Sequence, residues 1–152
     1  MSLLPAPSPS VRRVLQAVLY EFFAVLAVGP ALAWLFGHDL ASALGLAVVL
    51  STVALAWNYV FNGYFERWEA RQPVKGRSLA RRIAHGVGFE GGLVVLLVPI
   101  MAWWLDTTLW QAFVADLGIL VFFLVYAIGF TWAFDLVFGL PQSAQATPHP
   151  TA

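Results

Sequence analysis

Three carboxylic acids, Glu21, Glu90 and Asp116, lie inside long apolar stretches of the sequence and have the clearest capacity for chemistry. An ionised carboxylate near the centre of a bilayer costs about 2.5–3.5 kcal/mol on insertion scales, so it is usually placed facing other helices or water. Because hydrocarbon favours the neutral acid, such a group can exchange a proton for a cation. We expect these three residues to couple proton and substrate binding. The alternative is a protonated carboxyl group that only forms hydrogen bonds between helices.

Aromatic stripes at a spacing of four residues run along two of the apolar stretches, and one of these stretches also carries an amide stripe. Aromatic faces beside carboxylates suit organic cations. The residues expected to bind a substrate are Trp57, Asn58, Phe61, Asn62, Tyr126 and Phe130. Two alternatives are open: an aromatic belt at the membrane surface and helix packing through amide hydrogen bonds.

Charged and titratable residues near the ends of the stretches are expected to act as gates or supporting groups. They are Arg13, Arg82, His85, Glu66 and Asp135. An imidazole can titrate near neutrality, so His85 is a candidate pH sensor. Its alternative role is packing and hydrogen bonding.

The elements that position these residues are apolar segments long enough to cross a membrane. Of the 152 residues, 61% are hydrophobic and only 11% are charged, against about 25% charged in an average soluble domain. This composition excludes an ordinary soluble enzyme. Spanning a bilayer takes about 20 mostly apolar residues. The stretches that qualify are about 14–36, 41–65, 83–105 and 109–138. We expect an all-α integral membrane protein of four helices, because a barrel would need short alternating strands.

The distribution of basic residues predicts the orientation of the helices. All eight either precede the first span or lie between the second and third: Arg12, Arg13, Arg67, Arg71, Lys75, Arg77, Arg81 and Arg82. The two remaining short loops contain no Lys or Arg. The positive-inside rule therefore places both termini and the middle loop in the cytoplasm.

A shift of 69 residues aligns the two halves of the chain without a gap, placing Glu21 on Glu90 and Pro30 on Pro99. Since an even number of spans separates the copies, they have the same orientation. We expect two tandem, parallel-oriented helical hairpins. The segments are a disordered tail 1–11, a first helix pair 12–70, a cytoplasmic loop 71–80, a second helix pair 81–139 and a disordered tail 140–152.

Other chemistries are disfavoured. The chain has no cysteine and a net charge of zero, so neither a disulfide framework nor nucleic-acid binding is expected. The three histidines, His38, His85 and His149, are too scattered to suggest a metal site. No phosphate-binding glycine loop, metalloprotease motif or nucleophile motif is present. We expect no cofactor, no metal and no enzymatic activity.

The sequence resembles the proteobacterial antimicrobial compound efflux (PACE) family, in which two bacterial transmembrane pair domains occur in tandem. The family motif R-x-x-H-A-x-x-F-E appears as Arg13-x-x-Gln16-Ala17-x-x-Tyr20-Glu21 and again as Arg82-x-x-His85-Gly86-x-x-Phe89-Glu90. The motif W-N-x-x-Y-N-x-x-F-D appears as Trp57-Asn58-x-x-Phe61-Asn62-x-x-Phe65-Glu66. A looser motif appears as Ala112-x-x-x-Asp116 and as Tyr126 through Phe134-Asp135. The chain departs from the family pattern at Gln16, Glu66 and Thr131.

The resemblance implies export of cationic biocides such as chlorhexidine, and of short diamines, driven by a proton gradient. It also implies that Glu21 couples the proton to the substrate. We expect a homodimer in the bilayer that packs through the small residues Ala41, Ala43, Gly45 and Ala47. One alternative is an exporter like the small multidrug resistance proteins, although the strong charge asymmetry argues against antiparallel pairing. The other is a non-transporting membrane interaction or assembly protein.

Overall fold

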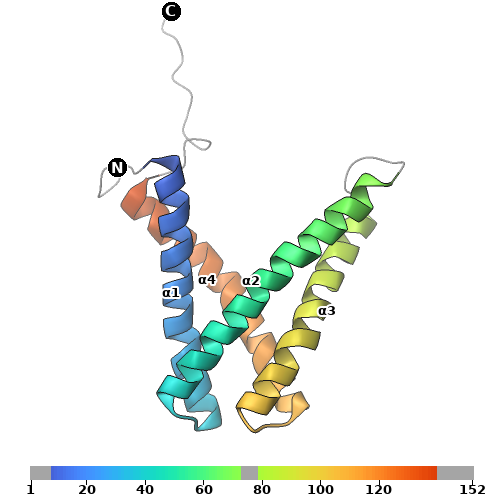
Figure 1. Ribbon diagram of the computed structural model, residues 1–152. Coiled ribbons are helices and arrows are strands. Elements are labelled where there is room, and N and C mark those ends of the chain that lie inside the picture. The colour runs from blue at the N-terminus through green and yellow to red at the C-terminus, as the bar shows by residue number, and fades with distance from the viewer. Residues whose placement is uncertain (1–7, 73–78, 140–152) are drawn as a thin grey trace, which may run out of the picture. The chain divides into compact units, whose positions relative to one another are not determined.

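The computed structural model describes residues 8–72 and 79–139, and these residues form helices and short connections without any strand. The helices are α1 (Pro9–Phe36), α2 (Leu40–Ala70), α3 (Leu79–Trp104) and α4 (Leu109–Phe138) (Figure 1). All four are long and apolar enough to cross a membrane. The order of elements therefore confirms the predicted all-α fold of two tandem hairpins, α1–α2 and α3–α4.

The ends of the chain differ in part from the expected tails. Helix α1 begins at Pro9, so residues 9–11, expected in the N-terminal tail, are helical. Proline is tolerated there because the first N–H groups of a helix have no partner inside the helix. Residues 1–7 and 140–152 of the two expected tails, and residues 73–78 of the expected loop, lie outside the described residues.

Equivalent residues of the two repeats lie at the starts of α2 and α4 and at the turns after α1 and α3. Asp39 precedes α2, and its Oδ2 accepts a hydrogen bond from Ser42 N at 3.1 Å. Thr108 precedes α4, and its Oγ1 accepts one from Gln111 N at 3.2 Å. Both contacts satisfy N–H groups that a helix start leaves without partners. After α1 and α3 the backbone turns through a positive φ, 65° at Gly37 and 46° at Asp106.

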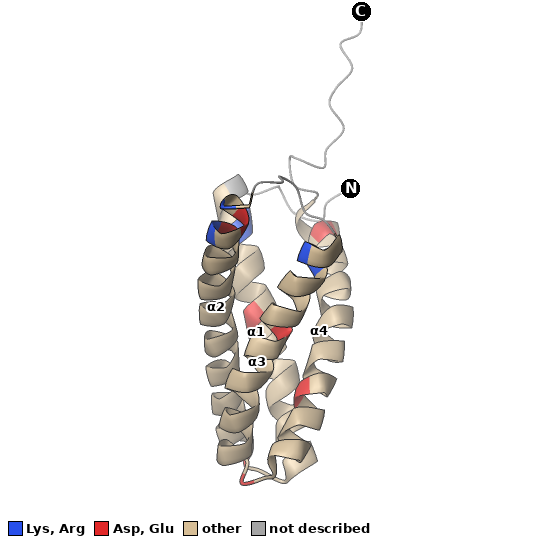
Figure 2. Ribbon diagram, turned by 90° about the vertical axis from the view of Figure 1, so that its right-hand side faces the viewer, with Lys and Arg blue, Asp and Glu red and all other residues tan. Residues whose placement is uncertain are grey.

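Most charged residues lie near the helix ends, and the acids Glu21, Glu90 and Asp116 lie within the helices. Figure 2 marks the positions of the charged residues on the ribbon. The basic residues of the described part of the chain are Arg12, Arg13, Arg67, Arg71, Arg81 and Arg82. Between these ends many large apolar side chains are exposed, including Trp34 at 83% and Ile128 at 75%. In water such a surface would be unfavourable, and it fits the apolar interior of a bilayer.

Contacts divide the chain into two units, residues 1–24 with 120–152 and residues 25–119. Most of the buried apolar side chains belong to the second unit, around Leu32, Leu46 and Met101, which are almost fully buried. In the first unit, Ala24 and Phe134 are buried. Both units contain residues predicted to be functional, and each is described separately below.

The small residues of α2 pack within the chain. Ala43 and Ala47 are 0% and 4% exposed, and a Cβ atom at Gly45 would lie 3.7 Å from Trp104 Cζ2. The expectation that these residues form a dimer surface was therefore wrong for Ala43 and Ala47, whereas Ala41 is exposed and Gly45 is partly exposed. Small side chains allow helices to approach closely, and here they serve the packing of one chain.

Candidate functional site

Aromatic rings join the C-terminal half of α2 to the N-terminal half of α3. Phe61 and Phe65 lie with ring centroids 5.2 and 4.8 Å from that of His85. Trp57 packs on Phe61 at 5.4 Å, and its Nε1 donates a hydrogen bond to the carbonyl oxygen of Phe89 at 2.9 Å. We call this set of five residues the α2–α3 contact. It contains Trp57 and Phe61, two of the predicted substrate-binding residues, together with His85.

Two glycines of α3 make room for this contact. A Cβ atom at Gly92 would lie 2.0 Å from Trp57 Cζ2, and one at Gly88 would lie 3.1 Å from Phe61 Cζ. The indole of Trp57 therefore occupies the space that a side chain at Gly92 would need. The glycines of the second repeat are visible in the sequence and could have indicated this close packing. They were not predicted to pack against the rings of α2.

The amide stripe of α2 forms a hydrogen-bonded chain that ends on His85. Asn62 Nδ2 donates to the carbonyl oxygen of Asn58 at 2.9 Å and also to Asn58 Oδ1. His85 Nε2 donates to Asn62 Oδ1 at 2.8 Å, because an amide oxygen can only accept. Asn58 and Glu66 are exposed, and both line an open groove along α2. The structure thus joins Asn62 to His85 and leaves Glu66 away from that hydrogen bond.

The corresponding contact in the other unit lies between α1 and α4. The ring of Tyr20 has its centroid 4.8 Å from that of Tyr126 and 5.2 Å from that of Phe130. The hydroxyl of Tyr126 donates to the carbonyl oxygen of Tyr20 at 2.7 Å. We call Gln16, Tyr20, Tyr126, Phe130 and Phe134 the α1–α4 contact. Each of these residues is 69 positions from its counterpart in the α2–α3 contact.

Both contacts place an aromatic donor next to a predicted coupling glutamate. Trp57 binds the carbonyl of the residue before Glu90, and Tyr126 binds the carbonyl of the residue before Glu21. Glu21 is half-buried and interacts electrostatically with Tyr126. The repeat has therefore conserved a donor at this point while changing its chemical type from indole to phenol.

Asp116 is the buried carboxylate among the described residues. It is 6% exposed, and no hydrogen bond or ion pair to another described residue satisfies it. Glu90, another predicted coupling residue, lies near enough for its charge to act on that of Asp116. The counterpart of Asp116 in the first repeat is Ala47, which is 4% exposed. An ordinary core position thus carries an acid in one repeat alone.

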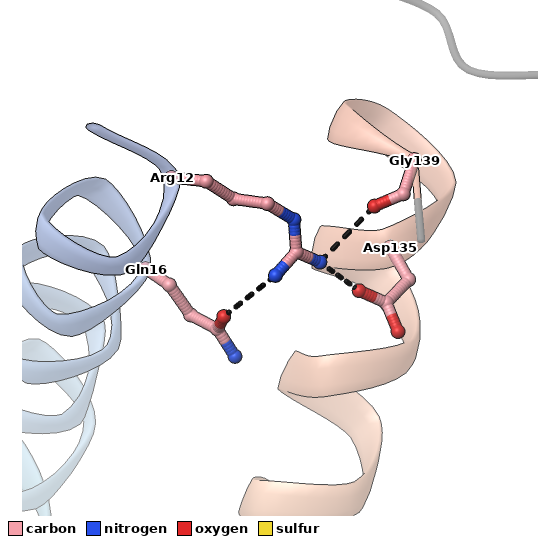
Figure 3. Close-up of polar contacts among 4 residues, drawn as sticks. All are labelled: Arg12, Gln16, Asp135 and Gly139. Carbon is pink, nitrogen blue, oxygen red and sulfur yellow. Dashed lines mark hydrogen bonds and ion pairs between the residues drawn. The ribbon is translucent and has the colours of Figure 1, made fainter. Parts of the chain in front are cut away.

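Arg12 joins the start of α1 to the end of α4 through several acceptors (Figure 3). Its Nη2 forms an ion pair with Asp135 Oδ1 and donates to the carbonyl oxygen of Gly139 at 3.0 Å. Its Nη1 donates to Gln16 Oε1 at 3.2 Å, and the guanidinium carbon lies 5.0 Å from the ring centroid of Phe134. We call this group the Arg12 clamp.

The clamp contains a basic residue, Arg12, that was not among the predicted site residues. Arg13 and Asp135 were each expected to act as gating or supporting groups, and the structure gives the ion pair of Asp135 to Arg12 and leaves Arg13 exposed. The four-residue spacing of Arg12 and Gln16 was the available signal, since residues four apart face each other on a helix. Among the described residues no three His, Asp or Glu side chains come together in a way that could hold a metal ion.

The family comparison gives the same two-part organisation. The family model described as "Chlorhexidine efflux transporter" (BTP) matches residues 8–71 and again residues 77–140. The chain belongs to this family. It is the PACE family, whose motifs the two repeats carry at Glu21 and Glu90, and the protein is therefore a membrane transporter.

Three curated relatives of this PACE protein bear the name short-chain diamines transporter. The one from Vibrio parahaemolyticus is 41% identical over 82% of this chain and 89% of its own length. Those from Acinetobacter baylyi and Acinetobacter baumannii are 34% and 35% identical over 84% and 83% of this chain. The matches cover 90% and 87% of those two proteins. No solved structure matches the chain.

Proposed function

We propose that this transporter exports cationic biocides of the chlorhexidine type and short-chain diamines in exchange for protons. The family and the names of the relatives support the two substrate classes. The observation that carries the proposal is the position of Glu21. It lies in the apolar helix α1, beside the Tyr20 and Tyr126 rings of the α1–α4 contact. The proposed activity of the protein is movement of a substrate across the membrane, without chemical conversion of that substrate.

Glu21 binds either a proton or a cationic group of the substrate. The carboxylate supplies the opposite charge, while the neighbouring ring faces attract a cation at a site with little water. A proton that arrives from outside displaces the substrate, and loss of that proton to the cytoplasm restores the carboxylate. Transport follows if the proton and the substrate differ in affinity for the inward-facing and outward-facing states.

Glu90 and Asp116 form a second acidic centre in this proposal. Two neighbouring acids in a low-dielectric setting do not both ionise readily, so a dicationic substrate can replace the protons held there. The membrane potential favours inward movement of positive charge by about 2.3 kcal/mol per elementary charge for each 100 mV. Because a dication carries two positive charges outward, the potential assists its export only when more than two protons enter in exchange, and otherwise the pH gradient supplies the driving force.

The proposed orientation has both termini in the cytoplasm and the helices in the bacterial inner membrane. The basic residues at the start of α1, the end of α2 and the start of α3 support it through the positive-inside rule. Since the chain has no cysteine, single cysteines at Asp39 and Arg71 report the two sides cleanly. In intact cells we expect a membrane-impermeant maleimide to label Asp39→Cys and not Arg71→Cys. The opposite pattern would reverse the topology.

We also propose a homodimer, because four helices enclose only a small pathway. Cross-linking in native membranes, followed by mass measurement of the detergent-solubilised protein, tests this. A monomer that transports at the full rate in nanodiscs would rule out any need for a dimer.

The test of the coupling role is Glu21→Gln in proteoliposomes. We expect loss of chlorhexidine and diamine transport under a pH gradient, with normal membrane insertion and thermal stability, because the amide keeps the shape and cannot release a proton. The matched control is Asp106→Asn, which makes the same acid-to-amide change in the short connection between α3 and α4. Undiminished proton-driven export by Glu21→Gln would remove Glu21 from the mechanism.

A further inference from the structure

We propose that the Arg12 clamp is a binding site for guanidinium-type cations, and that the protein's own Arg12 occupies it until a biguanide group of the substrate displaces it. This inference rests on the proposed function, since it assigns a recognition site to the biguanide class of substrate. Chlorhexidine carries two biguanide groups, and each presents the planar array of N–H donors found in an arginine side chain.

The surroundings of the guanidinium are those of a cation receptor. Arg12 meets a carboxylate oxygen of Asp135, the carbonyl oxygen of Gly139 and the amide oxygen of Gln16. The fourth contact is the ring of Phe134, whose face attracts cations. Every hydrogen-bonding atom in this set is an acceptor, and the acceptors lie in different directions (Figure 3). A planar fork of donors can satisfy them together, which a single ammonium group does less well.

Exchange of one cation for another avoids the main cost of opening the clamp. Removing Arg12 alone would leave the partly buried Asp135 without a counter-ion, which is strongly unfavourable. A substrate cation that replaces Arg12 keeps the charge balance and the hydrogen bonds. The side chain of Asp135 is 24% exposed, so a solute can reach it. Arg12 lies in the first turn of α1, from which its long side chain can move into water.

The clamp is also incompletely satisfied by its present occupant. Arg12 Nε is buried and has no hydrogen-bond partner among the described residues. An unpaired buried donor weakens binding relative to a ligand that leaves none. A biguanide, which has more donors and no tether to α1, is free to adopt the orientation that satisfies all of them. In the other repeat, the residue equivalent to Gln16 is His85, which donates to Asn62.

The direct test is chemical rescue of Arg12→Ala in the full-length purified protein. We expect the variant to melt at a lower temperature than the wild type and millimolar methylguanidinium to recover most of that loss. Methylammonium at the same concentration should recover less, because it lacks the planar fork. The charge-matched control is Arg71→Ala, at an exposed position after α2, which should show no such recovery. The double variant Arg12→Ala with Asp135→Asn should also lose the rescue. Equal effects of methylguanidinium on Arg12→Ala and Arg71→Ala would overturn the proposal.

A second variant gives the answer if Arg12→Ala does not fold. Arg12→Lys keeps the charge but loses the fork, so the internal ligand competes less well. We expect this variant to bind chlorhexidine about tenfold more tightly than the wild type, with little change in binding of a short diamine. Unchanged chlorhexidine affinity in Arg12→Lys would refute the clamp as a binding site. That result would leave the proposed function intact, since proton-coupled export is judged by Glu21→Gln alone.

Discussion

The α2–α3 contact and the α1–α4 contact derive from the same repeated pattern, yet they hold their helices together by different means. In the first, Gly88 and Gly92 present a bare backbone to the rings of Phe61 and Trp57. In the second, the equivalent residues are Leu19 and Phe23, so bulky side chains occupy that face of α1. The α1–α4 contact also contains hydrogen-bonding and ionic groups, since the Arg12–Asp135 ion pair lies at its end.

This difference indicates a division of roles between the two contacts. A ring that fills the space beside a glycine is fixed by shape, because close-packed groups cannot move without opening a void. Ion pairs and hydrogen bonds can be exchanged for equivalent ones with a ligand. We therefore infer that the α2–α3 contact serves mainly as a rigid support, and that the α1–α4 contact, which contains Glu21 and the clamp, is the part whose packing responds to substrate.

The largest expected effect comes from filling the glycine face. Gly92→Ala brings a Cβ atom to 2.0 Å from Trp57 Cζ2, so the indole must leave its position. We expect a loss of about 1–3 kcal/mol in the free energy of unfolding, as is typical of overpacking, measured by thermal or denaturant unfolding in detergent.

Two comparisons sharpen this experiment. Gly91→Ala is the matched control, because a Cβ atom there meets nothing within 4 Å. The double variant Gly92→Ala with Trp57→Tyr gives the first repeat the smaller phenol that the second repeat has at Tyr126, and it should regain part of the loss. A stable Gly92→Ala protein would show that the α2–α3 contact is not rigid.

A second comparison concerns Asp116 and its counterpart Ala47. Asp116→Ala gives the second repeat the residue that the first already uses at a buried position. Because an unpaired buried carboxyl group is removed, we expect stability to rise by about 1–3 kcal/mol, while substrate transport falls. Such an opposition between stability and activity marks residues kept for function. Unchanged transport in this variant would show that Asp116 has no role in transport.

Much of the fold was predictable from the sequence because long apolar spans, caps and charges act locally. Residue types and their spacing are enough to predict the four spans and the repeat. They also make Glu21 and Glu90 equivalent positions of that repeat. The repeat also implied that any contact made by Trp57 has a counterpart at Tyr126. These features need no knowledge of how helices pack.

The partners of individual side chains were less predictable, because they depend on the rotation of each helix. Arg12 and Arg13 are adjacent and chemically identical, and only the direction in which each leaves α1 decides that Arg12 meets Asp135. The rotation of α2 was also unknown, so its small residues were assigned to a dimer surface. In the structure Ala43 and Ala47 are buried within the chain. Spacing places residues on a common face, but it does not say what that face meets.

An intermediate effect is expected from the two aromatic donors. Trp57→Phe and Tyr126→Phe each remove one hydrogen bond to a carbonyl group, at 2.9 and 2.7 Å respectively, so each should lower the free energy of unfolding by about 0.5–1.5 kcal/mol. If the α1–α4 contact is the responsive one, Tyr126→Phe should also alter chlorhexidine transport. Trp57→Phe should affect transport only in proportion to stability. If Trp57→Phe and Tyr126→Phe were equally stable and equally impaired in transport, the proposed division of roles between the two contacts would be wrong.

The smallest effect is expected at the turns that follow α1 and α3, where the position of positive φ is a glycine in one repeat and an aspartate in the other. Gly37 and Asp106 both have positive φ, 65° and 46°, and a side chain in this region is strained by its Cβ atom. Asp106→Gly should therefore stabilise the protein by up to about 1 kcal/mol, and Gly37→Ala should destabilise it by a similar amount. Unfolding of the two single variants measures both changes. Because neither turn belongs to either helix contact, transport by Asp106→Gly should equal that of the wild type. A transport defect there would mean that the short connections, and not the two contacts alone, take part in the conformational change.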